Sequence, residues 1–209
     1  RVTVPVLWDT QTRTIVNNES AEIVRMLNRE FDAFATHDFP DLYPPELRAE
    51  IDEVNDRVYR TVNNGVYRAG FATAQDKYDA AVTALFESLD WLEARLAAQR
   101  WLCGNRFTEA DVRLWTTLVR FDAVYYGHFK CNLRRLADYP ALWGYTRDVY
   151  ALPGVAATVA SIGAMGVPVA RESSSAISSA SSASTPASPR GAASSGHMNG
   201  PPPSRSPPQ

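Results

Sequence analysis

Cysteine and histidine are the side chains that most readily do chemistry, and this sequence holds few of them. Its 209 residues include two cysteines, Cys103 and Cys131, and three scattered histidines. Neither cysteine belongs to a Cys-x-x-Cys pair, and no His/Cys cluster has the spacing of zinc ligands. The pattern therefore disfavours a metal site, a disulfide framework and a catalytic triad. We expect both thiols to behave as small buried apolar side chains.

Two short segments near the start of the chain have the residue types of a ligand site. Pro5 interrupts the strand-like run from Val2 to Trp8. A proline removes a backbone donor, so it marks a strand end or a special turn such as a cis peptide. Glu19 and Ser20 precede an apolar helical pattern, and a helix N-terminus attracts carboxylates. Simple capping by Ser20 explains the same residues.

The elements around these segments form a small β-β-α unit. Residues 2–8 and 14–16 are predicted to be short strands, the first of them buried, and residues 21–29 a helix capped by Ser20. Two strands and one helix are too few to fold alone. Residues 31–45 carry aromatic side chains and three prolines, which is typical of a linker between domains.

Helices are predicted for the rest of the globular part. One apolar stripe steps by three or four residues from Leu47 to Val62, and a longer one runs from Tyr78 to Leu96. A third helix, from Thr108 to Val124, is apolar almost all round and is therefore expected at the domain centre. A fourth runs from Pro140 to about Tyr150.

The third helix opens with a predicted capping box. Thr108 can cap the backbone N–H three residues further on, and Asp111 can accept from the N–H of Thr108. Phe107 and Val112 stand at the positions of a hydrophobic staple. Thr108 and Asp111 are therefore expected to be structural residues.

Composition narrows the functional classes. The formal net charge is −2, so there is no basic excess to drive nucleic-acid binding. No apolar run is long enough to suggest a membrane span, and a reducing, cytoplasmic location is expected. From Arg171 onward the chain is Ser-, Ala-, Pro- and Gly-rich, and it is expected to be disordered.

Several segments together resemble a known family. A strand with an embedded Val-Pro, a hairpin that ends in Asn-Glu-Ser and a helical domain with a Thr-x-x-Asp box are similar to a glutathione transferase. More specifically, the sequence resembles the glutathionyl-hydroquinone reductases, also called Xi-class or Omega-like transferases. The segments that carry this resemblance are residues 2–9, 15–23, 63–72, 121–125 and 127–132.

The resemblance implies a glutathione site in the first segments. The backbone of Val4, ahead of Pro5, is implied to pair with the cysteinyl backbone of glutathione like an added strand. Arg1, Val2 and Thr3 flank the same edge and are implied to line the site. Glu19 is implied to pair the γ-glutamyl ammonium, and Ser20 to take the carboxylate.

The resemblance also implies two catalytic tyrosines. Tyr67 matches the proton donor of the family, which protonates the ring carbon that leaves as hydroquinone. Tyr125 resembles a second active-site tyrosine that steadies the thiolate or the substrate, although the adjacent Tyr126 is easily confused with it. Glutathione is the implied co-substrate, with no metal.

The implied fold is α+β. Residues 1–29 would be the end of a thioredoxin-like glutathione-binding domain, and residues 30–46 a linker. Residues 47–159 would be an all-helical transferase domain, and residues 160–209 a disordered tail. The chain opens at Arg1, so we expect a fragment that lacks the family's Cys-Pro-Trp nucleophile segment.

The expected function is glutathione-dependent reduction of glutathionyl-hydroquinones in an enzyme that is a homodimer when complete. As given, the chain is expected to be inactive. Two alternatives stand beside this one: a non-catalytic transferase-like binding or assembly module, and a conventional conjugating transferase. A Cys-Pro-Trp segment upstream in the full gene would favour the reductase.

Overall fold

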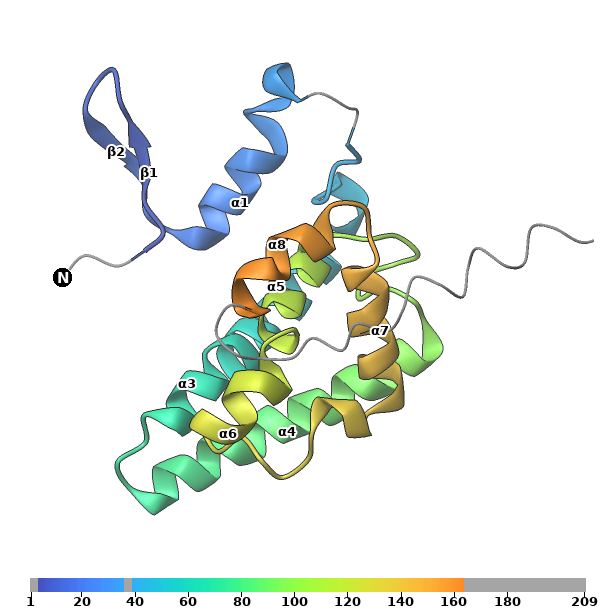
Figure 1. Cartoon of the computed structure of the whole chain (residues 1–209). Helices are drawn as coiled ribbons and strands as arrows, with labels where there is room; N and C mark the ends of the chain where they lie inside the picture. The colour runs from blue at the N-terminus through green and yellow to red at the C-terminus, as the bar shows by residue number, and fades with distance from the viewer. Residues whose placement is uncertain (1–3, 36–38, 164–209) are drawn as a thin grey trace, which may run out of the picture. The chain divides into compact units, whose positions relative to one another are not determined.

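The computed structural model describes residues 4–35 and 39–163 (Figure 1). Its first part contains strands β1 (Leu7–Asp9) and β2 (Thr14–Asn17), helix α1 (Ser20–Arg29) and the short 3₁₀ turn η1 (Asp32–Phe34). The rest is helical: η2 (Pro45–Leu47), α2 (Arg48–Val58), η3 (Tyr59–Asn63), α3 (Gly65–Gly70), α4 (Gln75–Ala98), α5 (Glu109–Leu118), η4 (Phe121–Tyr125), α6 (Tyr126–His128), η5 (Leu136–Asp138), α7 (Pro140–Tyr150) and α8 (Val155–Gly163). The expected α+β class, with a small sheet ahead of a helical domain, is confirmed.

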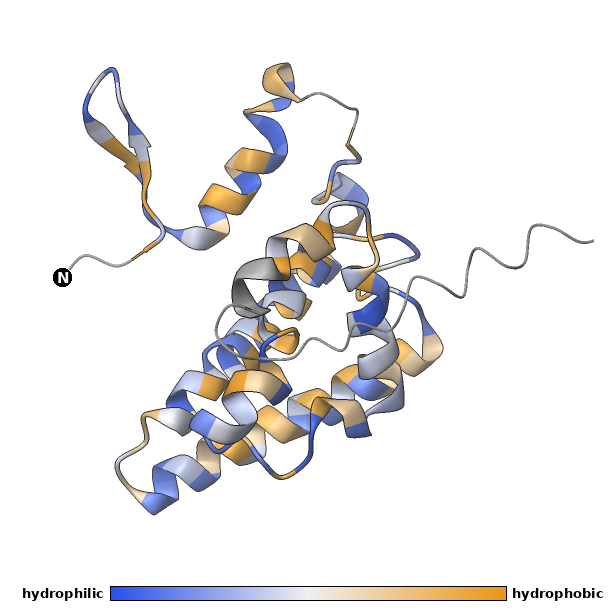
Figure 2. Ribbon diagram, in the orientation of Figure 1, coloured by the Kyte–Doolittle hydropathy of each residue, from blue (hydrophilic) through white to orange (hydrophobic). Residues whose placement is uncertain are grey.

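The hairpin is shorter and more exposed than expected. β1 and β2 pair antiparallel, and the carboxylate of Asp9 accepts the backbone N–H of Gln11 at 2.8 Å, which stabilises the turn. The prediction of a buried strand over residues 2–8 is wrong in the described part, because β1 begins only at Leu7 and Trp8 is 50% exposed. The reason is that the sheet of the described residues has two strands. Figure 2 shows apolar residues on the strands of this hairpin and hydrophilic residues at its turn.

Helix α1 begins one residue earlier than expected. Ser20 is its first residue, and Glu19 occupies the N-cap position without a side-chain capping bond. The prediction that Ser20 is the N-cap is therefore wrong. The physical reason lies one turn earlier: the side-chain oxygen of Asn17 accepts the N–H of Glu19 at 2.7 Å, and this turn brings Ser20 into the helix.

The core lies in the helical part. Apolar side chains of α4, among them Leu85, Leu89 and Leu92, are fully buried, and α4 packs against α3, η3 and α7. Leu114 and Leu118 of α5 are equally buried, which confirms the expected central position of this helix. α7 was predicted with the correct start and end.

Two π-helical segments take the place of the last turns of the helices that were predicted to end at Val62 and Val124. The first, η3, closes with the N–H of Asn64 donating to the carbonyl of Tyr59 at 2.9 Å. The buried stripe through this region steps by four residues from Val54 to Val66, whereas a regular helix turns in 3.6. The wider π turn absorbs this drift and keeps the stripe on the core. The second segment, η4, ends at Tyr125.

The predicted capping box at the start of α5 is present. The carboxylate of Asp111 accepts the N–H of Thr108 at 2.8 Å. It also accepts the N–H of Leu102 at 2.9 Å and the hydroxyl of Tyr145 at 3.0 Å. One buried carboxylate thus joins three parts of the helical region, and burial raises its pKa although these donors favour the charged form.

The end of the described chain was not anticipated. Helix α8 continues to Gly163, past the expected end of the globular part at residue 159. Residues 164–209, which hold nearly all of the predicted tail, lie outside the described residues, as do Arg1, Val2 and Thr3.

Candidate functional site

The two predicted tyrosines meet. Tyr67 lies on α3 and Tyr125 ends the π segment η4, yet their hydroxyl oxygens are 3.3 Å apart. Either hydroxyl can be the donor. Tyr67 is 44% exposed, whereas Tyr125 is 4% exposed. The pair therefore joins a phenol that a ligand can reach to one that the core holds in place, and it is Tyr125, rather than Tyr126, that contacts Tyr67.

Two phenylalanines complete an aromatic cluster around this pair. The ring of Phe129 lies 5.4 Å from the rings of both Tyr67 and Tyr125, in tilted and edge-on arrangements. Phe71 lies 5.3 Å from Phe129 and 6.2 Å from Tyr67. Such geometry is favourable for aromatic pairs. The four rings form an aromatic surface beside the exposed Tyr67 hydroxyl.

The close approach of Phe129 depends on Gly70. A Cβ atom at this position would lie 2.3 Å from the Phe129 ring, which is closer than any real contact. Gly70 is the last residue of α3, so the helix end and the ring can touch only because no side chain stands between them.

Burial controls the protonation of the inner tyrosine. It raises the pKa of Tyr125 to about 12, and the hydrogen bond to Tyr67 acts in the same direction. The nearby Arg120 charge opposes this shift without cancelling it. Tyr125 therefore stays protonated at neutral pH and can donate to, or accept from, the hydroxyl of Tyr67.

Sequence reasoning missed Phe71, Phe129 and Gly70, although a signal was present. Phe71 follows Tyr67 by four residues, and Phe129 follows Tyr125 by four. Side chains four residues apart on a helix are neighbours. Each tyrosine could therefore have been assigned a phenylalanine partner before the structure was known.

The predicted glutathione-binding residues that the structure describes are exposed. The Val4–Pro5 peptide bond is cis, one of the two conformations that the sequence allowed, and Val4 is 90% exposed. Glu19 and Ser20 are exposed at the start of α1. Among the described residues, neither forms a hydrogen bond or an ion pair with Tyr67 or Tyr125. Arg1, Val2 and Thr3 cannot be placed, because they lie outside the described part.

Helix α1 is tied to the helical part by Arg25. Its guanidinium donates to the carboxylate of Glu109 at 3.0 Å and to Asp52 at 2.6 Å. Tyr43 lies beneath the guanidinium at 3.8 Å and itself donates to Asp52 at 2.7 Å. Glu109 is 1% exposed and also accepts from Asn55 at 3.1 Å. The buried carboxylate of Glu109 thus forms an ion pair with Arg25 of α1, the helix that begins at Glu19 and Ser20.

The two thiols are inaccessible. Cys103 and Cys131 are both 0% exposed. Burial raises the pKa of Cys103 to about 12 and that of Cys131 to about 11. The thiolate is the nucleophilic form of cysteine, so neither residue is suited to that role at neutral pH.

In residues 4–35 and 39–163, no group of three or more His, Cys, Asp or Glu side chains is arranged to hold a metal ion. None of the helices in this part of the chain combines the length and the apolar character needed to cross a membrane.

The chain is similar to known proteins of the glutathione transferase type. Residues 75–148 match the family model of the glutathione S-transferase C-terminal domain. The chain is 60% identical over 159 residues to the glutathionyl-hydroquinone reductase YqjG of Escherichia coli, a match that covers 76% of this chain and 48% of that protein. It is also 60% identical over 143 residues to the glutathionyl-hydroquinone reductase PcpF of Sphingobium chlorophenolicum, with 68% of this chain and 45% of PcpF covered.

The chain is a homologue of the glutathionyl-hydroquinone reductases. Solved structures agree with this assignment. The glutathione-bound structure of Escherichia coli YqjG matches with a TM-score of 0.73 at 59% identity, over 76% of this chain and 51% of that one. A Xi-class transferase of Natrialba magadii matches with a TM-score of 0.74 at 55% identity, over 76% of this chain and 48% of that one. The chain thus spans about half the length of the relatives it matches.

Proposed function

We propose that this chain is the part of a glutathionyl-hydroquinone reductase that supplies the proton donor and one side of the glutathione site. The contact between the hydroxyls of Tyr67 and Tyr125, beside the ring of Phe129, is the observation that carries the proposal. It joins a reachable phenol to an aromatic surface, and a hydroquinone is itself a flat aromatic ring that such a surface can bind.

The proposed reaction begins with a cysteine thiolate, which the family resemblance assigns to a segment preceding this chain. The thiolate attacks the sulfur of the glutathionyl-hydroquinone. A disulfide forms between cysteine and glutathione, and the bond from sulfur to the ring carbon breaks. The ring carbon keeps the electron pair and takes a proton from the hydroxyl of Tyr67. A second glutathione loses its thiol proton, which restores the Tyr67 hydroxyl, and its thiolate attacks the mixed disulfide; glutathione disulfide leaves and the cysteine thiolate is restored.

The structure supports separate roles for the two tyrosines. Tyr67 is the exposed member and is placed to meet a substrate, whereas Tyr125 is buried and protonated. As a hydrogen-bond partner, Tyr125 holds the Tyr67 hydroxyl in position and stabilises the phenolate that forms when the proton leaves. Glu19 and Ser20 would bind the γ-glutamyl group, and the backbone of Val4 the cysteinyl group. The quinone-type substrate, a homodimer and a cytoplasmic location belong to the same proposal.

Steady-state kinetics test the proposal. The chain is joined to the preceding half of Escherichia coli YqjG, and turnover of a glutathionyl-hydroquinone is measured. Tyr67→Phe is expected to lower kcat by roughly 10²–10⁴, which is the usual contribution of a positioned general acid. Glutathione binding should hardly change in this variant, because the lost hydroxyl acts on the leaving carbon. Glu19→Ala should instead weaken glutathione binding, because the ammonium loses its partner.

Two further results decide the assignment. The double replacement of Cys103 and Cys131 by Ser should leave kcat for the glutathionyl-hydroquinone unchanged when turnover is normalised to the amount of folded protein. If this replacement abolishes turnover of folded protein while Tyr67→Phe leaves turnover intact, the roles proposed here are wrong. A conjugating transferase would be recognised by the opposite activity, namely formation of a glutathione thioether rather than its cleavage.

A further inference from the structure

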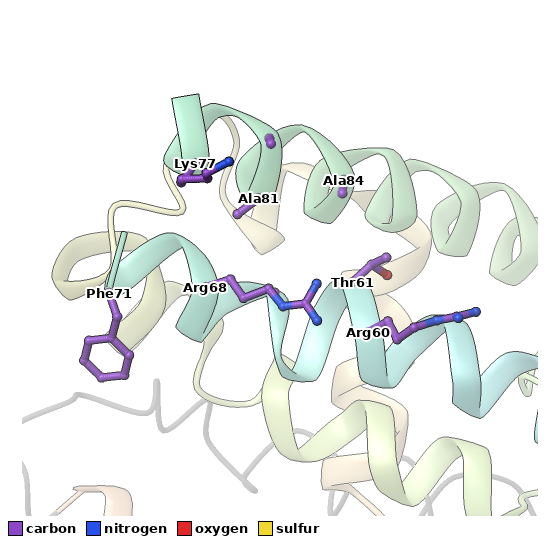
Figure 3. A pocket seen from close by; sticks show the side chains of 9 residues that line it. Arg60, Thr61, Arg68, Phe71, Lys77, Ala81 and Ala84 are labelled. Atoms are coloured by element: carbon purple, nitrogen blue, oxygen red, sulfur yellow. The ribbon is translucent and has the colours of Figure 1, made fainter. Parts of the chain in front are cut away.

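A positively charged groove lies between η3–α3 and α4, and of the four rings in the aromatic cluster Phe71 also lines this groove. Its volume is about 440 Å³, within the range of sites for small organic ligands. One wall carries Arg60, Thr61 and Arg68, and the other carries Lys77 and a row of alanines (Figure 3). We propose that this groove binds a small organic anion, with a carboxylate or sulfonate group attached to a flat apolar body.

The charges of the groove favour an anion. Arg68 has no acidic partner among the residues that the structure describes, and it stands across the groove from Lys77 (Figure 3). Lys77 has only the adjacent, largely exposed Asp76, at 3.5 Å. Arg60 is already paired with Asp56 along its own helix. The two side chains left to donate to a ligand are therefore Arg68 and Lys77, one from each wall.

The charges on the neighbouring surface limit where the anionic group of the ligand can bind. Beyond Arg60 and Thr61 the groove continues past three carboxylates, those of Glu53, Asp56 and Glu87, and one further cation, Arg57, so this stretch is less favourable for an anion. Thr61 donates its hydroxyl to the carbonyl of Arg57 at 2.7 Å, so it has no proton left for a ligand. The anionic group is therefore assigned to Arg68 and Lys77, which stand on opposite walls, with the Arg68 guanidinium extending along its wall toward Thr61 (Figure 3). This local positive charge is notable in a chain whose net charge is −2.

The floor of the groove suits the apolar body of such a ligand. Ala81 and Ala84 of α4, with Gly65 of α3, place small side chains along it. Small side chains leave space for a flat ring and expose little that needs hydrogen bonding. Two cations, one on each wall, with an apolar floor between the walls fit an aromatic carboxylate or sulfonate better than inorganic phosphate, which would use only the cations.

The test is a titration of the full chain with 2-naphthalenesulfonate, followed by amide chemical shifts in two-dimensional NMR. The expected shifts lie in the residues of the two walls, among them Arg60, Lys77 and Ala84, while Tyr125 and Phe129 of the aromatic cluster stay unshifted. Arg68→Ala should weaken binding about tenfold or more, because a charge-assisted hydrogen bond is lost. Arg134→Ala removes the same charge from a surface arginine that is paired with Asp90, and it should leave binding unchanged. The neutral 2-naphthalenemethanol should bind at least about tenfold more weakly than the sulfonate.

Three outcomes would overturn the proposal. The first is equal binding of the sulfonate and the neutral alcohol, and the second is a set of shifts confined to the exposed hairpin. The third is a groove filled by a second copy of the chain: Arg68→Ala would then change the molecular mass in analytical ultracentrifugation, and the sulfonate would leave the residues of the two walls unshifted. Tyr67→Phe should leave sulfonate binding unchanged, so failure of this proposal is separate from failure of the proposed reductase activity.

Discussion

The hydroxyls of Tyr67 and Tyr125 lie 3.3 Å apart although 58 positions separate the two residues in the chain. A π-helical segment precedes each of them, η3 before Tyr67 and η4 up to Tyr125 itself. π segments occur often at functional sites, because one added residue turns the following side chains to a new face. Here Tyr67 lies on α3, the helix after η3, and Tyr125 is the last residue of η4, so a π segment stands before or at each tyrosine.

The first prediction concerns pH and Tyr125. Its pKa rises from 10 to about 12 on folding, so the folded state holds this proton more tightly than the unfolded state. Its contribution to stability is complete below pH 10 and is lost as pH rises toward about 12. Urea unfolding of the chain and of Tyr125→Phe should therefore differ by a smaller free energy at pH 11 than at pH 8. If the difference in unfolding free energy between the two proteins is the same at pH 8 and at pH 11, the burial of this phenol is contradicted.

Much of this pair was predictable from sequence. Family resemblance pointed to Tyr67 and Tyr125, whereas the helices predicted from periodicity ended at Val62 and Val124 and did not include α3, which carries Tyr67. The hydrogen bond itself was not predictable, because no regular pattern predicts the π turns. They arise where a buried stripe with four-residue steps, from Val54 to Val66, must stay on the core.

Other sequence expectations failed for local reasons. Ser20 is a good N-cap by residue type, but the turn made by Asn17 places Glu19 there instead. The strand around Pro5 reads as buried from its apolar residues, whereas burial depends on what covers a strand. The capping box of Thr108 and Asp111, by contrast, was predictable in full, because both partners lie within one turn.

The second prediction tests the packing of Gly70 against Phe129. Gly70→Ala puts a methyl group where the ring now lies, so the ring must move, and the loss in unfolding free energy should be about 1–3 kcal/mol. Phe129→Leu in the same chain should recover part of this loss, because the smaller side chain leaves room. Urea denaturation measures both variants.

Gly144 provides the matched control for this experiment. It lies inside α7, and an added Cβ there meets nothing within 4 Å. Gly144→Ala should therefore be neutral or stabilise the chain by up to about 1 kcal/mol, as expected for a helix interior. Equal effects of the two substitutions would show that Gly70 is not held by the ring.

The third prediction concerns the attachment of α1. Arg25→Ala leaves the carboxylate of Glu109 buried with fewer donors, which should cost about 2 kcal/mol. Arg25 is itself 37% exposed, so water replaces part of the lost contact and keeps the cost moderate. Amide hydrogen exchange should increase throughout α1, because this helix loses its charged link to α2 and α5.

Arg29→Ala is the control for Arg25. Arg29 lies on the same helix, but its partner Asp41 is 3.7 Å away and both side chains are well exposed. Such pairs contribute little, so exchange in α1 should stay close to that of the unchanged chain. Equal loss of protection in both variants would show that helix propensity, rather than the link to Glu109, governs α1.

The fourth prediction tests the carboxylate of Asp111, which joins the start of α5 to Leu102 and to Tyr145 of α7. Asp111→Ala leaves two backbone N–H groups and two hydroxyls, those of Thr108 and Tyr145, without their acceptor in the core, at an expected cost of about 2–4 kcal/mol. Tyr145→Phe removes one of these donors, so the double variant should be less destabilised than the sum of the two single variants. Asp138→Ala breaks the similar box at η5, which is solvent-exposed, and should change stability little. Urea denaturation of all four variants decides the point: additive effects of Asp111 and Tyr145, or equal effects of Asp111 and Asp138, would mean that burial of the Asp111 network contributes nothing.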